Sequence, residues 1–118
     1  MPNPLRGEVW LARPPRDVQG HEQAGARPVL VLSADAINRG PSGLSIVVPL
    51  STRDRGIKLH LVVEPPEGGL RQRRVVIPEQ IHAADQSRLV ERWGMISDQT
   101  LRLVEDRLRI VLDLDGGV

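Results

Sequence analysis

The sequence predicts a mainly β fold, in which many short antiparallel strands form a small barrel-like sheet covered by one C-terminal amphipathic helix. Two patterns predict it. Short apolar runs are separated by segments rich in proline, glycine and aspartate, which is typical of strands joined by turns. Near residue 98 the apolar period changes from that of a strand to that of a helix. The chain has 118 residues, so we expect one domain over residues 1–118.

The strands are predicted from their apolar runs. The run at 27–33 is nearly all apolar, which predicts burial on both faces. The segment 57–63 alternates, which predicts a strand with His60 on the face opposite the apolar one. A short helical turn is expected over 34–40. The full set of predicted strands is 6–12, 27–33, 44–50, 57–63, 73–77, 81–83 and 88–95.

The final helix is predicted from residue 98 onward. Ser97 is a suitable N-cap, because its hydroxyl can accept a hydrogen bond from a free amide of the first turn. Glu105 and Arg109 stand four residues apart, which predicts a supporting ion pair on the polar face. Gly116 and Gly117 are expected to end the helix. Its apolar stripe comprises Leu101, Val104, Leu108, Val111 and Leu112.

Composition excludes several classes of protein. There is no cysteine, which rules out a disulfide scaffold, a zinc–thiolate site and a cysteine nucleophile. The net charge is only +1, so the chain is no polycationic coat for nucleic acid. Trp10 and Trp93 are the only aromatic residues, and we therefore expect no base-stacking platform. No signal peptide or membrane-spanning run precedes or interrupts the pattern, which together with the absent cysteines favours a cytoplasmic protein.

No metal or cofactor is expected. His21, His60 and His82 lack the spacing of metal ligands. The acidic residues are scattered over turns and the final helix, which gives no support to a glycosidase-like pair.

A set of motifs runs along most of the chain. The segment GHEQAGARP is the most specific of them, because six of its nine positions are constrained and it follows RGEVW at a defined distance. The set comprises RGEVW at 6–10, GHEQAGARP at 20–28, the apolar run 29–33, Asn38, VVPLST at 47–52 and PEQI at 78–81.

In these motifs the chain resembles the MazF/PemK family of toxins, the RNA-cleaving halves of bacterial toxin–antitoxin pairs. The resemblance implies a small SH3-like, PemK-type antiparallel barrel with a C-terminal helix, assembled as a homodimer. It also implies a sequence-specific, metal-independent endoribonuclease that cuts single-stranded messenger RNA. Attack by a ribose 2′-hydroxyl would leave a 2′,3′-cyclic phosphate and a 5′-hydroxyl, stopping translation and growth until a cognate MazE-like antitoxin neutralises the toxin.

The resemblance assigns the catalytic positions to Arg27 and Ser51. The guanidinium of Arg27 matches two phosphoryl oxygens and suits the stabilisation of a phosphorane. It is a poor base, since it holds its proton up to a pKa of about 12 or above. The base is therefore sought in Glu22, His21 or water. Ser51 stands where the family has threonine, and Thr52 would take that position in a register shifted by one.

Four further residues are expected to support the reaction or bind RNA. Gln23 lies inside the specific motif, and Gln80 follows the last predicted turn. Thr52 and Arg53 follow Ser51 directly. Arg53 and Arg55 are candidates for phosphate contacts, with a solvated turn as the alternative. The run of residues 71–74, RQRR, is a candidate for a second basic rim, with the same alternative.

A second function is open to a chain of this fold. A CcdB-like protein on the same fold would poison DNA gyrase without catalysis, through aromatic and apolar residues at its C-terminus. This chain ends in DLDGGV, without an aromatic residue, and carries the arginine motif. Both features favour the nuclease. A passive RNA-binding module is disfavoured by the near-neutral charge.

Overall fold

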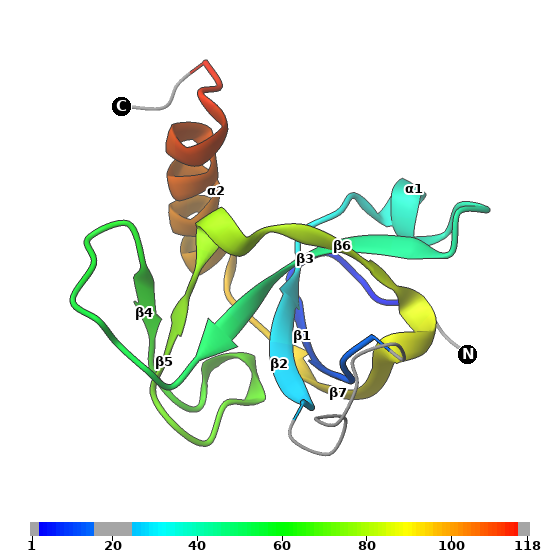
Figure 1. Ribbon diagram of the computed structural model, residues 1–118, viewed down its shortest axis with the longest axis horizontal. Helices are drawn as coiled ribbons and strands as arrows, with labels where there is room; N and C mark the ends of the chain where they lie inside the picture. Colours follow the sequence, from blue (N-terminus) through cyan, green and yellow to red (C-terminus); the bar gives the residue numbers. More distant parts are fainter. Residues whose placement is uncertain (1–2, 16–24, 116–118) are drawn as a thin grey trace.

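The computed structural model describes residues 3–15 and 25–115 (Figure 1). Within these residues the chain forms seven strands, two α-helices and three short 3₁₀ helices. The elements, in chain order, are β1 (Glu8–Ala12), β2 (Arg27–Val31), α1 (Asp35–Asn38), β3 (Leu44–Ser51), β4 (Leu61–Val63), η2 (Glu67–Gly69), β5 (Arg74–Val76), η3 (Pro78–Gln80), β6 (His82–Asp85), η4 (Gln86–Arg88), β7 (Leu89–Met95) and α2 (Asp98–Leu112).

The strands form one antiparallel sheet in the order β4-β5-β3-β2-β1-β7, and β6 also pairs with β3. The predicted mainly β class with a C-terminal helix is confirmed. The hydrogen-bonded path is open, because β4 and β7 end it without pairing to each other. β3 is the longest strand and carries β2 along one edge and β6 followed by β5 along the other, so it runs through the middle of the molecule (Figure 1).

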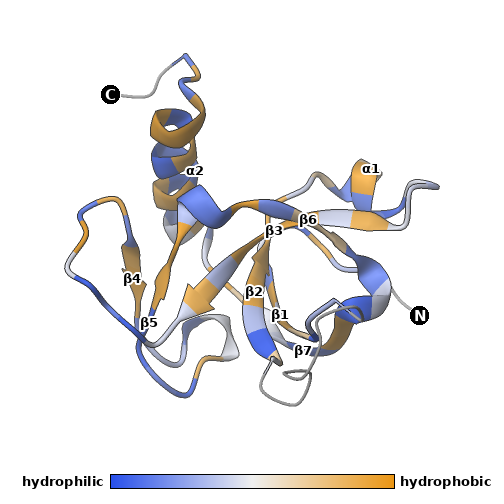
Figure 2. Cartoon of the chain, in the orientation of Figure 1, coloured by the Kyte–Doolittle hydropathy of each residue, from blue (hydrophilic) through white to orange (hydrophobic). Residues whose placement is uncertain are grey.

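The core lies on both faces of the sheet, as the apolar run at 27–33 predicts. Leu30 and Leu32 join one apolar cluster, whereas Val29 and Val31 join another on the opposite face. The two sets alternate along the chain, because successive side chains of a strand point to opposite faces. Figure 2 shows the same division, with apolar residues concentrated in the strands and in stripes along α2.

Helix α2 covers the first cluster through the first part of the predicted apolar stripe, whereas Leu112 at the end of that stripe is exposed. Val104 is fully buried there, and Leu101 and Leu108 pack beside it. The predicted N-cap is confirmed, since the Ser97 hydroxyl accepts a hydrogen bond from the Thr100 amide at 3.1 Å. The predicted glycine stop is wrong: the helix ends at Leu112, and Asp113 adopts the left-handed conformation with φ of 55°. Gly116 and Gly117 lie outside the described residues.

The predicted pair of Glu105 with Arg109 is also wrong. Arg109 bonds Asp106 instead, at 2.8 Å, one position nearer in the helix. Glu105 forms its ion pair with Arg6, far away in the sequence. Glu105 therefore pairs with a residue that the fold brings close, and not with its neighbour along the helix.

The predicted strand 57–63 is correct only over its last part. β4 spans Leu61–Val63, whereas the preceding residues form a turn in which the His60 amide donates to the carbonyl of Ile57 at 3.0 Å. The turn reverses the expected exposure. Ile57 is 44% exposed, and His60 is buried. Alternation alone cannot separate a strand from a turn that happens to alternate. The other predicted strands differ from the observed ones only at their ends.

Candidate functional site

Arg27 and Ser51 lie at the same end of two paired strands. Arg27 begins β2 and is exposed, and Ser51 ends β3 and is half-buried. The β2–β3 pairing runs from Val31–Val47 to Val29–Pro49, so Arg27 and Ser51 each lie two residues beyond its last pair. Side chains two residues apart on a strand point to the same face. Arg27 therefore shares the face of Val29, and Ser51 shares the face of Val47, which lies in the same apolar cluster as Val29. Strand pairing therefore brings the two sequence-predicted catalytic residues to the same end of β2 and β3.

The Ser51 hydroxyl is held in a defined position. Its Oγ accepts a hydrogen bond from the Arg53 amide at 3.0 Å, which forms a small turn just after the strand. The hydroxyl hydrogen stays free to rotate toward an acceptor. Ser51 still belongs to the sheet through its pairing with Val75, whereas Thr52 follows the strand and is exposed. This placement favours Ser51 over Thr52 as the positioned hydroxyl.

A small hollow of about 120 Å³ opens beside Ser51. We call it the Ser51 hollow. Its walls carry Arg53 and Gln80, two of the residues expected to support the site, together with the ion pair of His60 and Glu79. Arg27 instead borders a separate hollow of about 430 Å³, together with His82 and Pro49. Arg53 and Gln80 thus line the same hollow as Ser51, whereas Arg27 lines a different one.

The pair of His60 and Glu79 was missed by sequence reasoning. His60 Nε2 lies 2.8 Å from Glu79 Oε2, and the His60 side chain is only 4% exposed. The hydrogen bond from His60 holds the pKa of Glu79 below its ordinary value. His60 Nδ1 is buried and has no hydrogen-bond partner among the described residues. Only the turn at 57–60 brings this histidine inward, and the alternating sequence pattern masks that turn.

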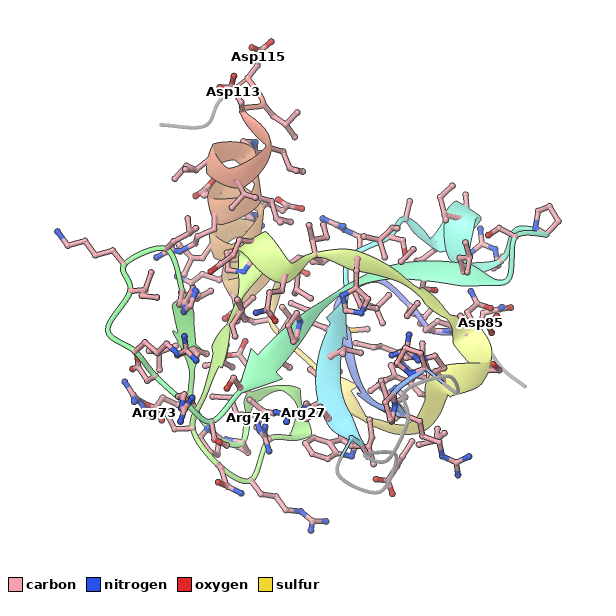
Figure 3. All side chains as sticks on the ribbon, in the orientation of Figure 1. Arg27, Arg73, Arg74, Asp85, Asp113 and Asp115 are labelled. Atoms are coloured by element: carbon pink, nitrogen blue, oxygen red, sulfur yellow. The ribbon has the colours of Figure 1, made fainter. Side chains whose placement is uncertain are left out.

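Arg74 belongs to the run 71–74 that the sequence offers as a basic rim, and the structure places it at the start of a strand next to β3. It begins β5, and its Nη1 donates to the carbonyl of Leu50 at 3.1 Å. Burial, followed by the positive charge of Arg27, lowers the pKa of Arg74 below its ordinary value. Figure 3 shows the labelled Arg27 and Arg74 near each other at one edge of the sheet, away from Asp85, Asp113 and Asp115. Two neighbouring guanidinium groups make this edge suited to an anion.

Arg73 is a weaker candidate for the basic rim. It bonds Asp54 at 3.1 Å and Glu64 at 3.2 Å, so its charge is already balanced. Arg27 has no ion pair among the residues that the structure describes, and neither has Arg71. Some arginines near the site are therefore neutralised by a carboxylate, and others are free to bind an anion. The sequence does not show which are which.

The first motif, RGEVW, serves the scaffold. Burial raises the pKa of Glu8, but hydrogen bonds from Arg92, the Leu5 amide and Trp10 outweigh burial and set the pKa below its ordinary value. Gly7 has φ of 92°, and its carbonyl accepts from the Ile96 amide at 3.0 Å. These bonds tie the start of β1 to β7 and to the entry of α2.

The family-model comparison matches residues 5–112 of the chain to the PemK-like, MazF-like toxins of type II toxin–antitoxin systems. The chain belongs to this family. The family assignment agrees with the resemblance that the motifs indicate, and it covers every element from β1 to α2.

Solved structures of the family share the fold. MazF from Deinococcus radiodurans is 30% identical, with a TM-score of 0.77 over 97% of this chain and 100% of that one. A MazE–MazF complex from the same organism is 26% identical, with a TM-score of 0.77 over 98% and 100% of the two chains. An endoribonuclease from a mycobacterial species is 25% identical, with a TM-score of 0.75 over 98% and 96%.

Three predicted residues lie in a part of the chain that the structure does not describe. His21, Glu22 and Gln23 lie outside the described residues, so their placement relative to Arg27 stays a prediction. In residues 3–15 and 25–115 there is no cluster of three or more side chains suited to a metal ion. None of the helices within these ranges has the length and apolar character that crossing a membrane requires.

Proposed function

We propose that this protein is a sequence-specific endoribonuclease that cleaves single-stranded messenger RNA and is neutralised by an antitoxin. Membership of the MazF-like toxin family supports this function, and so does the likeness to a MazF toxin and to a mycobacterial endoribonuclease. The single observation that carries the proposal is that exposed Arg27 and half-buried Ser51 lie at the same end of the paired strands β2 and β3.

The proposed chemistry is metal-independent transesterification. The 2′-hydroxyl attacks the adjacent phosphorus and loses its proton to a base, the P–O5′ bond breaks, and the 5′-oxygen takes a proton. Arg27 stabilises the charge that builds on the phosphoryl oxygens, through a fork that fits two of them. Ser51 donates its hydroxyl hydrogen to a phosphoryl oxygen, because the Arg53 amide already bonds its oxygen.

The general base is assigned to a group other than Arg27. A guanidinium keeps its proton throughout the physiological range, so it accepts none from the 2′-hydroxyl. Glu22, His21 and a water molecule remain the candidates. A weakly activated base implies slow turnover, which is sufficient for a toxin that has only to outpace messenger synthesis.

The proposal includes the setting of the reaction. We propose a homodimer in the cytoplasm, whose RNA groove crosses the two copies and whose cleavage of messenger RNA stops translation. The antitoxin is proposed to be MazE-like, because a MazE–MazF complex shares the fold over nearly the whole chain. The gyrase-poison alternative is not proposed, since it gives no role to Arg27.

The test is cleavage of a long synthetic RNA in EDTA, with the cut sites mapped by primer extension. The wild-type protein should cut at a recurring short sequence, and Arg27→Ala should not. Arg102→Ala is the matched control, because Arg102 is exposed on α2, away from β2 and β3. Product ends that polynucleotide kinase labels without prior phosphatase treatment would indicate 5′-hydroxyls. Intact RNA with the wild-type protein, or unchanged cleavage by Arg27→Ala, would refute the proposal.

A further inference from the structure

A hollow of about 500 Å³ lies beyond Arg74, on the side of Trp93. We call it the Trp93 hollow. Its walls come from β7, from the start of β5 and from the segment between η2 and β5. Trp93 lies at its floor, half-buried, with part of its ring packed against the first apolar cluster. Neither Arg27 nor Ser51 lines this hollow.

The floor is held rigidly. Gly69 has φ of 73°, and a Cβ added to it would lie 2.0 Å from the Trp93 carbonyl oxygen. A Cβ on Gly94 would lie 2.7 Å from the Gly68 carbonyl carbon. The η2 backbone therefore packs directly on the β7 backbone, and the indole stands on a fixed base. The indole nitrogen donates to Glu91 Oε1 at 2.8 Å, which further limits rotation of the ring.

Positive charge lines the same hollow. The guanidinium carbon of Arg74 lies 6.0 Å from the centroid of the Trp93 ring, at the outer limit of a cation–π contact. Arg74 lines the hollow, and its Nε is buried without a partner among the described residues. Arg71 and Gln72 complete the rim, and both are exposed. A fixed aromatic ring beside unused arginine donors is the arrangement that binds a base and its phosphate together.

We propose that the Trp93 hollow binds one nucleotide of the single-stranded RNA, with its base stacked on Trp93 and its phosphate held by Arg71 and Arg74. The inference rests on the proposed function, because the nucleotide would belong to the RNA that is cut near Arg27, the neighbour of Arg74 in Figure 3. The carboxylate of Glu91 and the amide of Gln72 stand at the rim to contact the base edge. The expectation of no stacking platform is thereby revised to a single stacking position.

The first test measures binding without cleavage. A fluorescein-labelled 2′-O-methyl RNA has no free 2′-hydroxyl and stays intact, so its anisotropy reports affinity alone. Trp93→Ala should raise the Kd about tenfold, since stacking contributes about 1–3 kcal/mol per base. Trp93→Phe should stay within about threefold of wild type, because a ring is kept. Met95→Ala, a change of an exposed residue on the same strand, is the control and should leave the Kd unchanged.

The second test uses tryptophan emission and needs no destabilising substitution. Adding the 2′-O-methyl RNA should quench the wild-type protein, and the quenching should disappear in Trp93→Phe, because Trp10 is buried. An unchanged Kd in folded Trp93→Ala, or no quenching on binding, would overturn the inference. Quenching by an acidic, leucine-rich peptide and not by RNA would assign the hollow to a protein partner and also overturn it.

The experiments distinguish a failure of the proposed nuclease function from a failure of the proposed nucleotide site at Trp93. If the wild-type protein cleaves RNA and Trp93→Ala binds the 2′-O-methyl RNA normally, the nuclease stands and the nucleotide subsite falls. If no RNA is cut but binding still depends on Trp93, the subsite stands and the catalytic assignment falls.

Discussion

β3 carries a polar cluster at each end, and the two clusters differ in how completely their polar atoms are bonded. At the start of β3, the Ser45 and Ser33 hydroxyls both donate to Asn38 Oδ1, at 2.7 Å and 2.5 Å. Asn38 Nδ2 donates to the Ser33 carbonyl at 3.1 Å, and Gln86 Nε2 reaches Ser45 Oγ at 3.0 Å. Every member of this cluster has partners within the fold.

The cluster at the end of β3 is incomplete. His60 Nδ1 and Arg74 Nε are buried without a partner among the described residues, and Arg27 is exposed without an ion pair there. Buried polar atoms without partners are costly, so proteins keep few of them. The fully hydrogen-bonded cluster at the start of β3 therefore stabilises the fold. The cluster at the end of β3, whose polar atoms lack partners, is the one suited to a ligand.

The largest expected effect is on catalysis at the incomplete end. Arg27→Ala should lower the rate of RNA cleavage about 10²- to 10³-fold, because it removes the charge that stabilises the phosphorane. Urea unfolding should show a stability within about 0.5 kcal/mol of wild type, as is usual for an exposed residue. A stability loss as large as that of a core change would break the comparison.

The bonded end should respond in the opposite way. Asn38 is fully buried, and Asn38→Ala removes the acceptor of two hydroxyl hydrogens and the side-chain donor to the Ser33 carbonyl. We expect a loss of about 2–3 kcal/mol in the free energy of unfolding. The rate of cleavage per folded molecule should not change. A rate loss in a fully folded variant would mean that Asn38 acts on the site.

Two serines on one strand sharpen the comparison. Ser51→Ala should lower the cleavage rate about tenfold with little change in stability, because it removes one hydrogen-bond donor from an open site. Ser45→Ala should lower the stability by about 1 kcal/mol and keep the rate, since its hydroxyl bonds only within the fold. Activity retained in Ser51→Ala and lost in Thr52→Val would move the hydroxyl to Thr52.

The smallest expected effect concerns acid stability at the incomplete end. The His60 hydrogen bond lowers the pKa of Glu79 below its ordinary value of 4.5. This pair therefore adds stability above that pH, and the contribution is lost as the pH falls through the lower, folded-state pKa. The Glu79 side chain is 43% exposed, so solvent screening limits the effect to about 0.5 kcal/mol.

Urea midpoints measured from pH 6 down to about pH 3 check this expectation. Glu79→Gln should flatten the acid-side decline slightly relative to wild type. Glu64→Gln is the control, because the Glu64 side chain is 65% exposed and bonds only the exposed Arg73. An equal flattening by both substitutions would show that His60 gives Glu79 no special protection.

The sequence by itself determined the class, the family and the order of the elements. Period and turn residues are local properties, so the strands, the Ser97 cap and the apolar stripe of α2 follow from neighbours along the chain. The motif containing Arg27 pointed to the family that the comparison confirms. The roles of Arg27 and Ser51 stay predictions until the cleavage test is made.

Only the tertiary structure decided which charges are balanced and which polar atoms are left without partners. Glu105 meets Arg6 and not Arg109, the turn before β4 carries His60 to Glu79, and Arg74 comes near Arg27 through strand pairing. These contacts join residues far apart in the sequence, and their choice depends on which groups the packed sheet brings together. Local pattern carries no information on that choice, because hydrogen bonds and ion pairs form between whichever partners packing leaves within reach.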